Sequence, residues 1–306
     1  MKLVVICSYD STFKFNNKGN MMRTILITGV STGIGQSIAE EILKTNQYIV
    51  IGSVRNIDDG KYLKKNYKNF YEVIFDVTKK DEIESGKIEI KKILKTNNSY
   101  LSCLVNNAGI AVGGPVRYLD VDYFRHQFEV NLFGLIEVTK QFLDLLIANN
   151  DNKMKNKIIN IGSISGKRSY PFVAPYTSSK HALEGFTDSL RRELLLHDID
   201  VVLLQPGPIK TPIWDKVPNI EENPFLNTEY KDALIKFNQQ YLKAIESSGF
   251  HPSIIGNKVV KILKTNKPKT RYVITPKILK NYIIPGFLPD RWVDKIIGKM
   301  LNLSRK

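Results

Sequence analysis

The sequence predicts an α/β fold, a single doubly wound domain with a mostly parallel seven-stranded sheet and helices on both faces. Three observations predict it. From residue 24 onward, short apolar runs alternate with longer segments of helical period. The first run leads through a glycine-rich turn into a helix, and polar residues follow several later runs. Regular alternation is typical of parallel strands joined by helical crossovers, and 306 residues suffice for one large core.

The individual elements are expected from local periodicity. Strands are expected at residues 24–28, 48–55, 70–77, 101–105, 158–161, 200–204 and 271–275. Helices are expected after the glycine-rich turn and at residues 81–95, 120–149 and 174–197. Residues 1–22 read poorly as structure, with Met21 and Met22 directly before the first convincing strand. We expect residues 1–22 to be a dispensable extension, upstream of the functional start, and residues 23–275 to form the domain.

Composition limits the classes of partner. The net charge of +15 is scattered along the chain, so we expect no nucleic-acid partner. The densest basic interval, residues 258–280, is expected to be solvated, with an anionic partner or membrane surface as the alternative. Of the two cysteines, Cys7 and Cys103, the second lies in an apolar run, which suits a reducing compartment. Since no run could span a membrane and residues 3–7 are too short for a secretory signal, we expect a cytoplasmic protein.

The first turn has the pattern of a phosphate cradle. It reads Gly29-Val-Ser31-Thr32-Gly33-Ile34-Gly35. Glycines let the backbone approach a ligand closely, and the following helix offers free amides and a partial positive charge. The alternative is a tight turn without a ligand.

The end of the second strand bears on the choice of dinucleotide. It reads Ser53-Val54-Arg55, with no carboxylate before Asp58. A carboxylate there would bind the ribose hydroxyls of NAD, whereas a guanidinium would pair with the 2′-phosphate of NADP. We therefore expect NADP(H) to be preferred, with NAD(H) as the second candidate. Arg55 could equally do no more than end a strand.

Further polar groups follow later strands. Asp76 and Val77 end the third expected strand, Asn107-Ala108-Gly109 follows the fourth, and Pro206-Gly207 follows the sixth. Open parallel sheets bind ligands at these carboxyl ends. Turn formation alone would favour several of the same residue types.

One stretch carries candidate acid–base chemistry. Tyr176 and Lys180 are four residues apart on an expected helix and share a face. An adjacent ammonium favours the phenolate, so we expect Lys180 to lower the pKa of Tyr176. Ser163 precedes them and could donate a hydrogen bond to a carbonyl oxygen. The pair alone could also be an ordinary amphipathic helix, and Asn131 is unfavourable by propensity inside the helix expected at 120–149.

Together these motifs resemble the short-chain dehydrogenase/reductase family, whose members have a Rossmann-type fold. The resemblance covers about residues 23–211 and continues more weakly to residue 276. It rests on the order and spacing of the glycine-rich turn, Asp76, the Asn107 segment, Asn131, Ser163, the Tyr176–Lys180 pair and the segment from Pro206 to Thr211. The branch that it most resembles contains retinol and steroid dehydrogenases and carbonyl reductases.

The resemblance implies a role for each residue. Asn131, Ser163, Tyr176 and Lys180 would form a catalytic tetrad, in which Asn131 kinks its helix and holds a water that links Lys180 to a proton relay. Tyr176 would be the general acid or base while the nicotinamide exchanges a hydride. Cofactor contacts are expected from Gly29, Ser31, Thr32, Gly33, Ile34, Gly35, Arg55, Asp76, Val77, Asn107, Ala108, Gly109, Tyr176, Lys180, Pro206, Gly207, Ile209 and Thr211. Many NADP-preferring members have a basic residue where this chain has Thr32, so the preference rests mainly on Arg55.

The rest of the chain bears on the substrate. Residues 212–252 are expected to cover it, and their apolar residues favour a lipophilic carbonyl or alcohol such as a retinoid, steroid or lipid-derived ketone. The same aromatic residues could instead pack within the lid. Residues 276–306 form an amphipathic, basic extension, which we expect to dock on the body or on a second subunit, with peripheral contact to a membrane surface as the alternative.

Two other functions remain open at this point. A 3-oxoacyl-carrier-protein reductase would use basic patches for an acidic carrier, and a non-catalytic NADP(H)-binding redox sensor would commonly lack the Tyr or the Lys. The family implies a homodimer or homotetramer through the helices at 120–149 and 174–197. The four histidines show no metal spacing, so no metal is expected.

Overall fold

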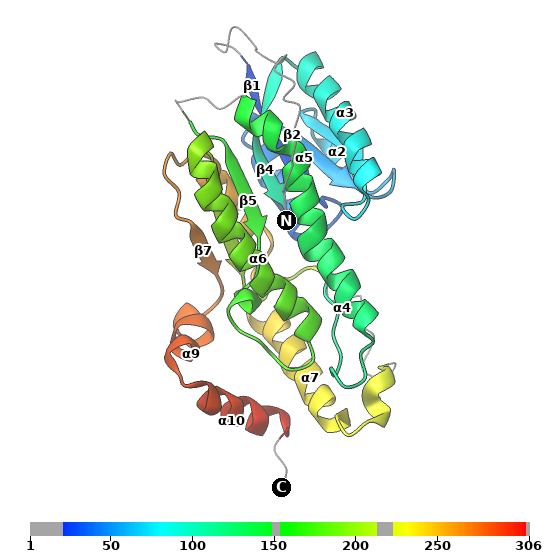
Figure 1. Ribbon diagram of the computed structural model, residues 1–306, viewed down its shortest axis with the longest axis vertical. Coiled ribbons are helices and arrows are strands. Elements are labelled where there is room, and N and C mark those ends of the chain that lie inside the picture. Colours follow the sequence, from blue (N-terminus) through cyan, green and yellow to red (C-terminus); the bar gives the residue numbers. More distant parts are fainter. Residues whose placement is uncertain (1–20, 149–153, 213–222, 304–306) are drawn as a thin grey trace, which may run out of the picture.

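The computed structural model describes residues 21–148, 154–212 and 223–303. Seven strands form one sheet in which every neighbouring pair is parallel, in the order β3-β2-β1-β4-β5-β6-β7 (Figure 1). The strands are β1 (Met22–Thr28), β2 (Tyr48–Val54), β3 (Phe70–Ile74), β4 (Ser99–Asn106), β5 (Lys157–Ile161), β6 (Asp200–Pro206) and β7 (Arg271–Ile274). The predicted doubly wound fold is confirmed.

Helices cover both faces of the sheet. They are α1 (Gly33–Leu43), α2 (Lys61–Asn66), α3 (Lys80–Thr96), α4 (Val121–Phe128), α5 (Leu135–Ala148), α6 (Ala174–Glu193), α7 (Lys231–Ser248), α8 (Ser253–Leu263), α9 (Ile284–Phe287) and α10 (Asp290–Leu301). Helices α1 and α8 pack on one face, and α3, α5 and α6 pack on the other.

The alternation of side chains along β1 builds both halves of the core. Ile25 and Ile27 point to the face covered by α1 and α8, whereas Leu26 points to the opposite face. Since successive strand residues alternate between faces, a strand buried on both sides must be apolar throughout. This is why the central strands read as continuous apolar runs.

The helix expected at residues 120–149 is interrupted. Between α4 and α5, residues Glu129–Gly134 form a wider π-helical turn that contains Asn131. A π turn shifts the hydrogen-bond register and frees polar groups for other partners. The helix expected at 120–149 is thus interrupted at Asn131, the residue that is unfavourable by propensity and that the resemblance implies would kink it.

The C-terminal extension packs against the body. The side-chain amide of Gln240 in α7 donates a hydrogen bond to the carbonyl of Met300 in α10 (3.1 Å), and Arg168 donates to the carbonyl of Tyr282 (3.2 Å). Helices α7, α9 and α10 gather at one end of the molecule (Figure 1). Of the two expected docking sites, the body and a second subunit, the structure shows contact with the body.

Some predictions concern residues outside the described part. Residues 1–20 of the expected extension, with Cys7, and the segment 213–222 within the expected lid lie there, and their predictions stay untested. The bound of the extension at residue 22 was wrong, because Met22 begins β1 and pairs with Ser99 of β4. Cys103 is buried, as expected, and burial raises the pKa of its thiol to about 12. Among the described residues, no helix has both the length and the apolar character needed to cross a membrane.

Candidate active site

A cavity of about 1100 Å³ lies at the carboxyl ends of the strands. It begins at the glycine-rich turn after β1, where the strand order reverses between β1 and β4, and open parallel sheets bind ligands at such switch points. Most of the predicted site residues line it: Gly29, Ser31, Thr32, Gly33, Ile34, Arg55, Asp76, Val77, Asn107, Ala108, Gly109, Ser163, Tyr176, Lys180, Pro206, Gly207, Ile209 and Thr211. Gly35 and Asn131 do not line the cavity.

The glycine-rich turn fits a phosphate. Gly29 and Gly33 have φ angles of +70° and +63°, a conformation that favours glycine. Thr32 precedes α1 without capping it through its side chain, so no side chain caps the amides of the first turn. Gly35 has a packing role instead, because a Cβ there would overlap the carbonyl oxygen of Gly29 and the amide of Asn107.

Asn107 holds this turn in place. Its side-chain amide donates hydrogen bonds to the carbonyls of Thr28 and Gly29, both at 2.9 Å. The hydroxyl oxygen of Thr28 accepts hydrogen bonds from the backbone N–H groups of Asn107 and Ala108, both at 3.0 Å. The loops after β1 and β4 are thus tied together, and the predicted ribose contact of Asn107 stays a prediction.

Two charged groups, Arg55 and Asp76, line the cavity beside the glycine-rich turn. Arg55 directly follows β2 and is exposed, and no carboxylate of the described residues forms an ion pair with it. Asp76 accepts hydrogen bonds from the N–H (2.9 Å) and hydroxyl (2.8 Å) of Thr78, which orients its carboxylate beside the cavity. A free guanidinium there can bind an anion.

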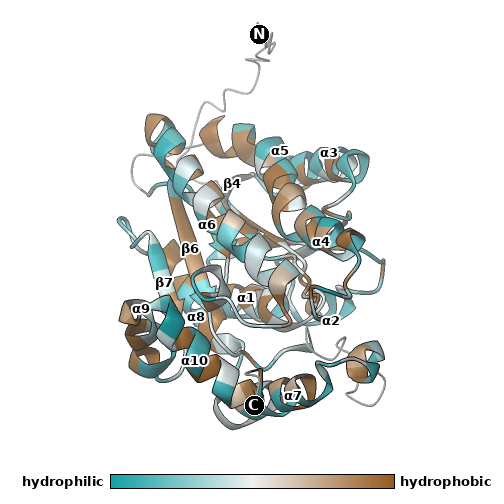
Figure 2. Ribbon diagram, turned by 60° about the horizontal axis from the view of Figure 1, so that its bottom comes forward, coloured by the Kyte–Doolittle hydropathy of each residue, from teal (hydrophilic) through white to brown (hydrophobic). Residues whose placement is uncertain are grey.

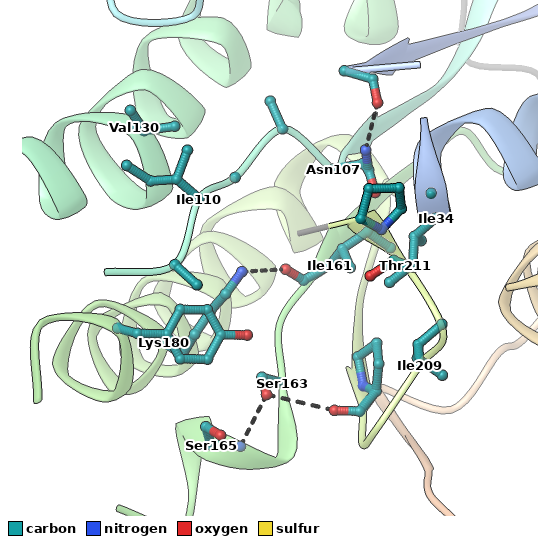
Figure 3. A pocket seen from close by; sticks show the side chains of 18 of the residues that line it. Ile34, Asn107, Ile110, Val130, Ile161, Ser163, Ser165, Lys180, Ile209 and Thr211 are labelled. Atoms are coloured by element: carbon teal, nitrogen blue, oxygen red, sulfur yellow. Dashed lines mark hydrogen bonds between the residues drawn. The ribbon is translucent and has the colours of Figure 1, made fainter. Parts of the chain in front are cut away.

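Ser163, Tyr176 and Lys180 come together beyond the end of β5. The Ser163 hydroxyl accepts a hydrogen bond from the N–H of Ser165 (3.1 Å) and contacts the carbonyl of Pro206 at 3.5 Å (Figure 3). The Lys180 amine donates to the carbonyl of Ile161 (2.8 Å) and lies 5.8 Å from the centroid of the Tyr176 ring. The three side chains face one cavity, as their spacing predicted.

The protonation of this group differs from the expectation. Burial raises the pKa of Tyr176, and a hydrogen bond with Ser163 opposes that shift only in part. Burial also lowers the pKa of Lys180 to about 8. The prediction that Lys180 lowers the pKa of Tyr176 is therefore wrong for this structure, because loss of hydration disfavours the charged form of both groups.

Asn131 supports the site from behind. Its side-chain oxygen accepts a hydrogen bond from the N–H of Ile110 (2.9 Å), and its amide donates to the carbonyl of Ile110 (3.1 Å) and the hydroxyl of Ser179 (3.2 Å). The side chain is 1% exposed. Asn131 thus connects the π turn to the loop after β4 and to α6, and its predicted water-mediated link to Lys180 stays a prediction.

Part of the cavity wall is mainly apolar. It contains residues that the motifs did not single out as site residues: Tyr170, Val173, Phe237, Ala244, Ile297, Met300 and Leu301. Phe237 lines the cavity and also packs edge-on against Phe172, around which Tyr230 and Leu234 of the same region pack as well. The alternative that these aromatic residues pack within the lid is thus confirmed, and their expected contact with a substrate stays a prediction. Only the amphipathic period of α7 and α10 could have indicated this wall.

Metal binding finds no support in the described residues, which contain no group of three or more His, Cys, Asp or Glu side chains arranged for an ion. His126 lines the cavity and is exposed.

Comparison with known proteins identifies the family. The family model described as short chain dehydrogenase matches residues 23–222. The NADPH-dependent 3-dehydrocapnine reductase of Ornithobacterium rhinotracheale is 39% identical over 282 residues, which are 92% of this chain and 98% of that protein. A 3-ketodihydrosphingosine reductase of Bacteroides thetaiotaomicron is 29% identical over 254 residues, 83% of this chain and 88% of its own.

A solved structure agrees with these sequence matches. A short-chain dehydrogenase from Streptomyces avermitilis has a TM-score of 0.71 and 22% identity, and the match covers 94% of this chain and all of the other. At that identity the likeness shows the fold alone, while the family model and the 39% identical reductase extend it to the sequence. This chain belongs to the short-chain dehydrogenase family.

Proposed function

We propose that this oxidoreductase uses NADPH to reduce a ketone on a lipid-derived substrate. The observation that carries the proposal is the single cavity, which connects a phosphate-binding turn, a Ser–Tyr–Lys cluster and an apolar wall. Two relatives support it by name, since one is a 3-dehydrocapnine reductase dependent on NADPH and the other reduces 3-ketodihydrosphingosine.

The residues fit NADPH at the glycine-lined end of the cavity. The turn from Gly29 to Gly33 and the uncapped start of α1 would hold the pyrophosphate, and Arg55 would pair with the 2′-phosphate. Asp76 and Val77 would border the adenine, and Ile209 and Thr211 would contact the carboxamide. When bound, the cofactor supplies the hydride.

Tyr176 supplies the proton in this proposal. A phenol whose pKa is raised by burial stays protonated at neutral pH, and this protonated form is the one that ketone reduction requires. Ser163 would donate a hydrogen bond to the ketone oxygen and so orient it toward Tyr176. Lys180, held by Ile161, would bind the ribose hydroxyls and help to return a proton to Tyr176 through a water held by Asn131.

The substrate would occupy the apolar end. Phe237, Ile297, Met300 and Leu301 give that end a long wall without charged side chains. Apolar walls with a few polar groups at one point are typical of sites that bind a lipophilic molecule in one orientation. A reductase of carrier-linked 3-oxoacyl groups would place much of its substrate outside such a wall.

The test is replacement of Tyr176 by Phe. We expect turnover of 3-ketodihydrosphingosine with NADPH to fall by about 10²-fold or more, while NADPH binding, measured by fluorescence, changes little. Tyr62→Phe, an exposed position on α2, is the matched control and should leave turnover unchanged. Unchanged turnover in Tyr176→Phe would contradict the catalytic role.

A substrate panel tests the second half of the proposal. NADPH oxidation would be measured with 3-ketodihydrosphingosine, retinal, a steroid ketone and a 3-oxoacyl thioester. Preference for the lipid ketone supports the proposal, and preference for any of the other three corrects it. Binding of NADPH without turnover of any carbonyl would favour the redox sensor.

A further inference from the structure

The C-terminal segment, residues 277–303, exposes large apolar side chains on one side. In α10, Leu301 is buried and Val293 and Ile297 are half-buried against the body, whereas Trp292 and Ile296 are 61% and 55% exposed. Phe287 in α9 is 86% exposed. The body therefore covers only part of the apolar side of α10, and Trp292 and Ile296 lie on its uncovered face.

Cations flank the uncovered face. Lys277, Lys280, Arg291, Lys295 and Lys299 are all exposed, and none of the ion pairs among the described residues involves them. Asp290 and Asp294 are the acidic residues of the segment. Figure 2 shows hydrophobic and hydrophilic positions side by side on α9 and α10. A basic, amphipathic helix with exposed aromatic residues is typical of segments that bind in the headgroup region of a membrane.

This surface adjoins the cavity. Met300 is 44% exposed and also lines the cavity, as do Ile297 and Leu301 of the same helix. The uncovered face of α10 and the apolar wall thus share one edge. If α10 binds a surface, a molecule that moves from that surface into the cavity would contact this apolar wall first.

We propose that the C-terminal segment binds the surface of an anionic lipid bilayer and places the apolar end of the cavity beside it. The anionic headgroups of such a bilayer are complementary to the five unpaired cations, and its headgroup region accommodates the exposed aromatic side chains. A second copy of this chain would cover the aromatic side chains but would bring two sets of unpaired cations together. Insertion is peripheral, since no described helix can cross a membrane.

Vesicle sedimentation tests the binding with the full chain. We expect the protein to sediment with phosphatidylcholine vesicles that contain phosphatidylglycerol, to bind pure phosphatidylcholine more weakly, and to be released by high salt. The double variant Lys295→Glu, Lys299→Glu should bind about 25-fold more weakly or worse, at about fivefold for each cation lost. The double variant Phe287→Ser, Trp292→Ser should also lose binding.

Matched controls exist elsewhere in the chain. Leu195 and Leu196 are 73% and 84% exposed beyond the end of α6, and their double Ser variant should bind vesicles normally. Lys64→Glu, Lys65→Glu on α2 is the control for charge, and thermal unfolding checks that every variant folds. None of the substituted residues lines the cavity.

Three results would overturn the proposal. The first is that the unmodified chain does not sediment with anionic vesicles. The second is that the Leu195/Leu196 control loses as much vesicle binding as Phe287→Ser, Trp292→Ser. The third is that Phe287→Ser, Trp292→Ser converts a dimer to a monomer while the unmodified chain binds no vesicles. The last result would assign the face to a second copy. Access of a lipid substrate from the bilayer rests on the proposed function, but vesicle binding does not, so failure of one can be distinguished from failure of the other.

Discussion

A buried lysine amine lies at each end of strand β5, and the two amines differ in what surrounds them. Lys157 begins the strand, is fully buried and donates to the carbonyl of Lys155 (3.0 Å). Lys180 of α6 donates to the carbonyl of Ile161, the last residue of the strand (2.8 Å). Burial lowers the pKa of both amines. The amine at the amino end is closed in by core, whereas the amine at the carboxyl end opens onto the cavity.

The comparison shows that a lowered lysine pKa does not by itself mark a functional site. Lys157 lies near Cys103 and Asp200, which partly offset the lowering of its pKa by burial, and near Arg23, which lowers that pKa further. Lys180 has Tyr176 beside it and a glycine-rich turn across the cavity. The loops that form the cavity converge at the carboxyl ends of the parallel strands, where Lys180 lies. At the amino end of β5, Lys157 has only a packing role.

The largest expected effect separates the two lysines directly. Lys180→Met should lower kcat/KM for reduction by about 10²- to 10⁴-fold, because in the proposed mechanism the ammonium would take part in proton transfer and cofactor binding. Lys157→Met should leave kcat/KM unchanged and should not lower stability, because a poorly hydrated buried charge is replaced by an apolar chain. Steady-state kinetics and thermal unfolding of both variants give the test. Equal losses of kcat/KM in the two variants would contradict the functional difference between the two lysines.

Arg55, also at the carboxyl ends, should affect only one cofactor. Arg55→Ala should raise KM for NADPH about 10- to 100-fold, since charge-assisted hydrogen bonds contribute about 1.5–3 kcal/mol, and should leave KM for NADH unchanged. Lys64→Ala on the neighbouring α2 is the control. Similar effects on both cofactors would show that Arg55 does not select the 2′-phosphate.

The pH dependence of activity should report Lys180. Its ammonium predominates below about pH 8 and is lost above it, so kcat/KM for reduction should be level near neutrality and fall above about pH 8 by up to about tenfold per unit. Because the folded pKa is lowered, the contribution of this group to stability rises between about pH 8 and 10.5. Lower activity without unfolding, followed by circular dichroism, is the expected result, and unchanged kcat/KM to pH 9 would contradict it.

The smallest effect concerns an ion pair at the amino end of β7. Arg271 pairs with Asp188 of α6 (2.8 Å) and lowers the pKa of that carboxyl from 3.8 to about 2. The pair therefore contributes at pH values above about 4, and its contribution is lost as pH falls from about 4 to 2. Asp188→Asn should lower the free energy of unfolding by about 1–2 kcal/mol at pH 7 and by much less near pH 2, measured by urea unfolding, with kcat/KM unchanged. A large loss of activity would show that the amino end also serves the site.

Much of the site could be predicted from local sequence. The motifs after β1, β2, β4, β5 and β6 each stand beside a strand end, and parallel strands place those ends together. The spacing of Tyr176 and Lys180 put both on one face of α6, and both line the cavity. The mid-helix Asn131 marked a departure from regular geometry, which is the π turn.

The sequence by itself determined the fold, the family and the residues that converge on one cavity, because these depend on periodicity and on motifs within one strand–loop–helix unit. Only the tertiary structure decided the protonation of Tyr176, the position of Gly35 and Asn131 behind the cavity, and the wall from α7 and α10. Burial and hydration depend on segments more than a hundred residues apart in the chain. The free energy of a charge or an apolar side chain is set by what packs around it, and local sequence does not contain that information.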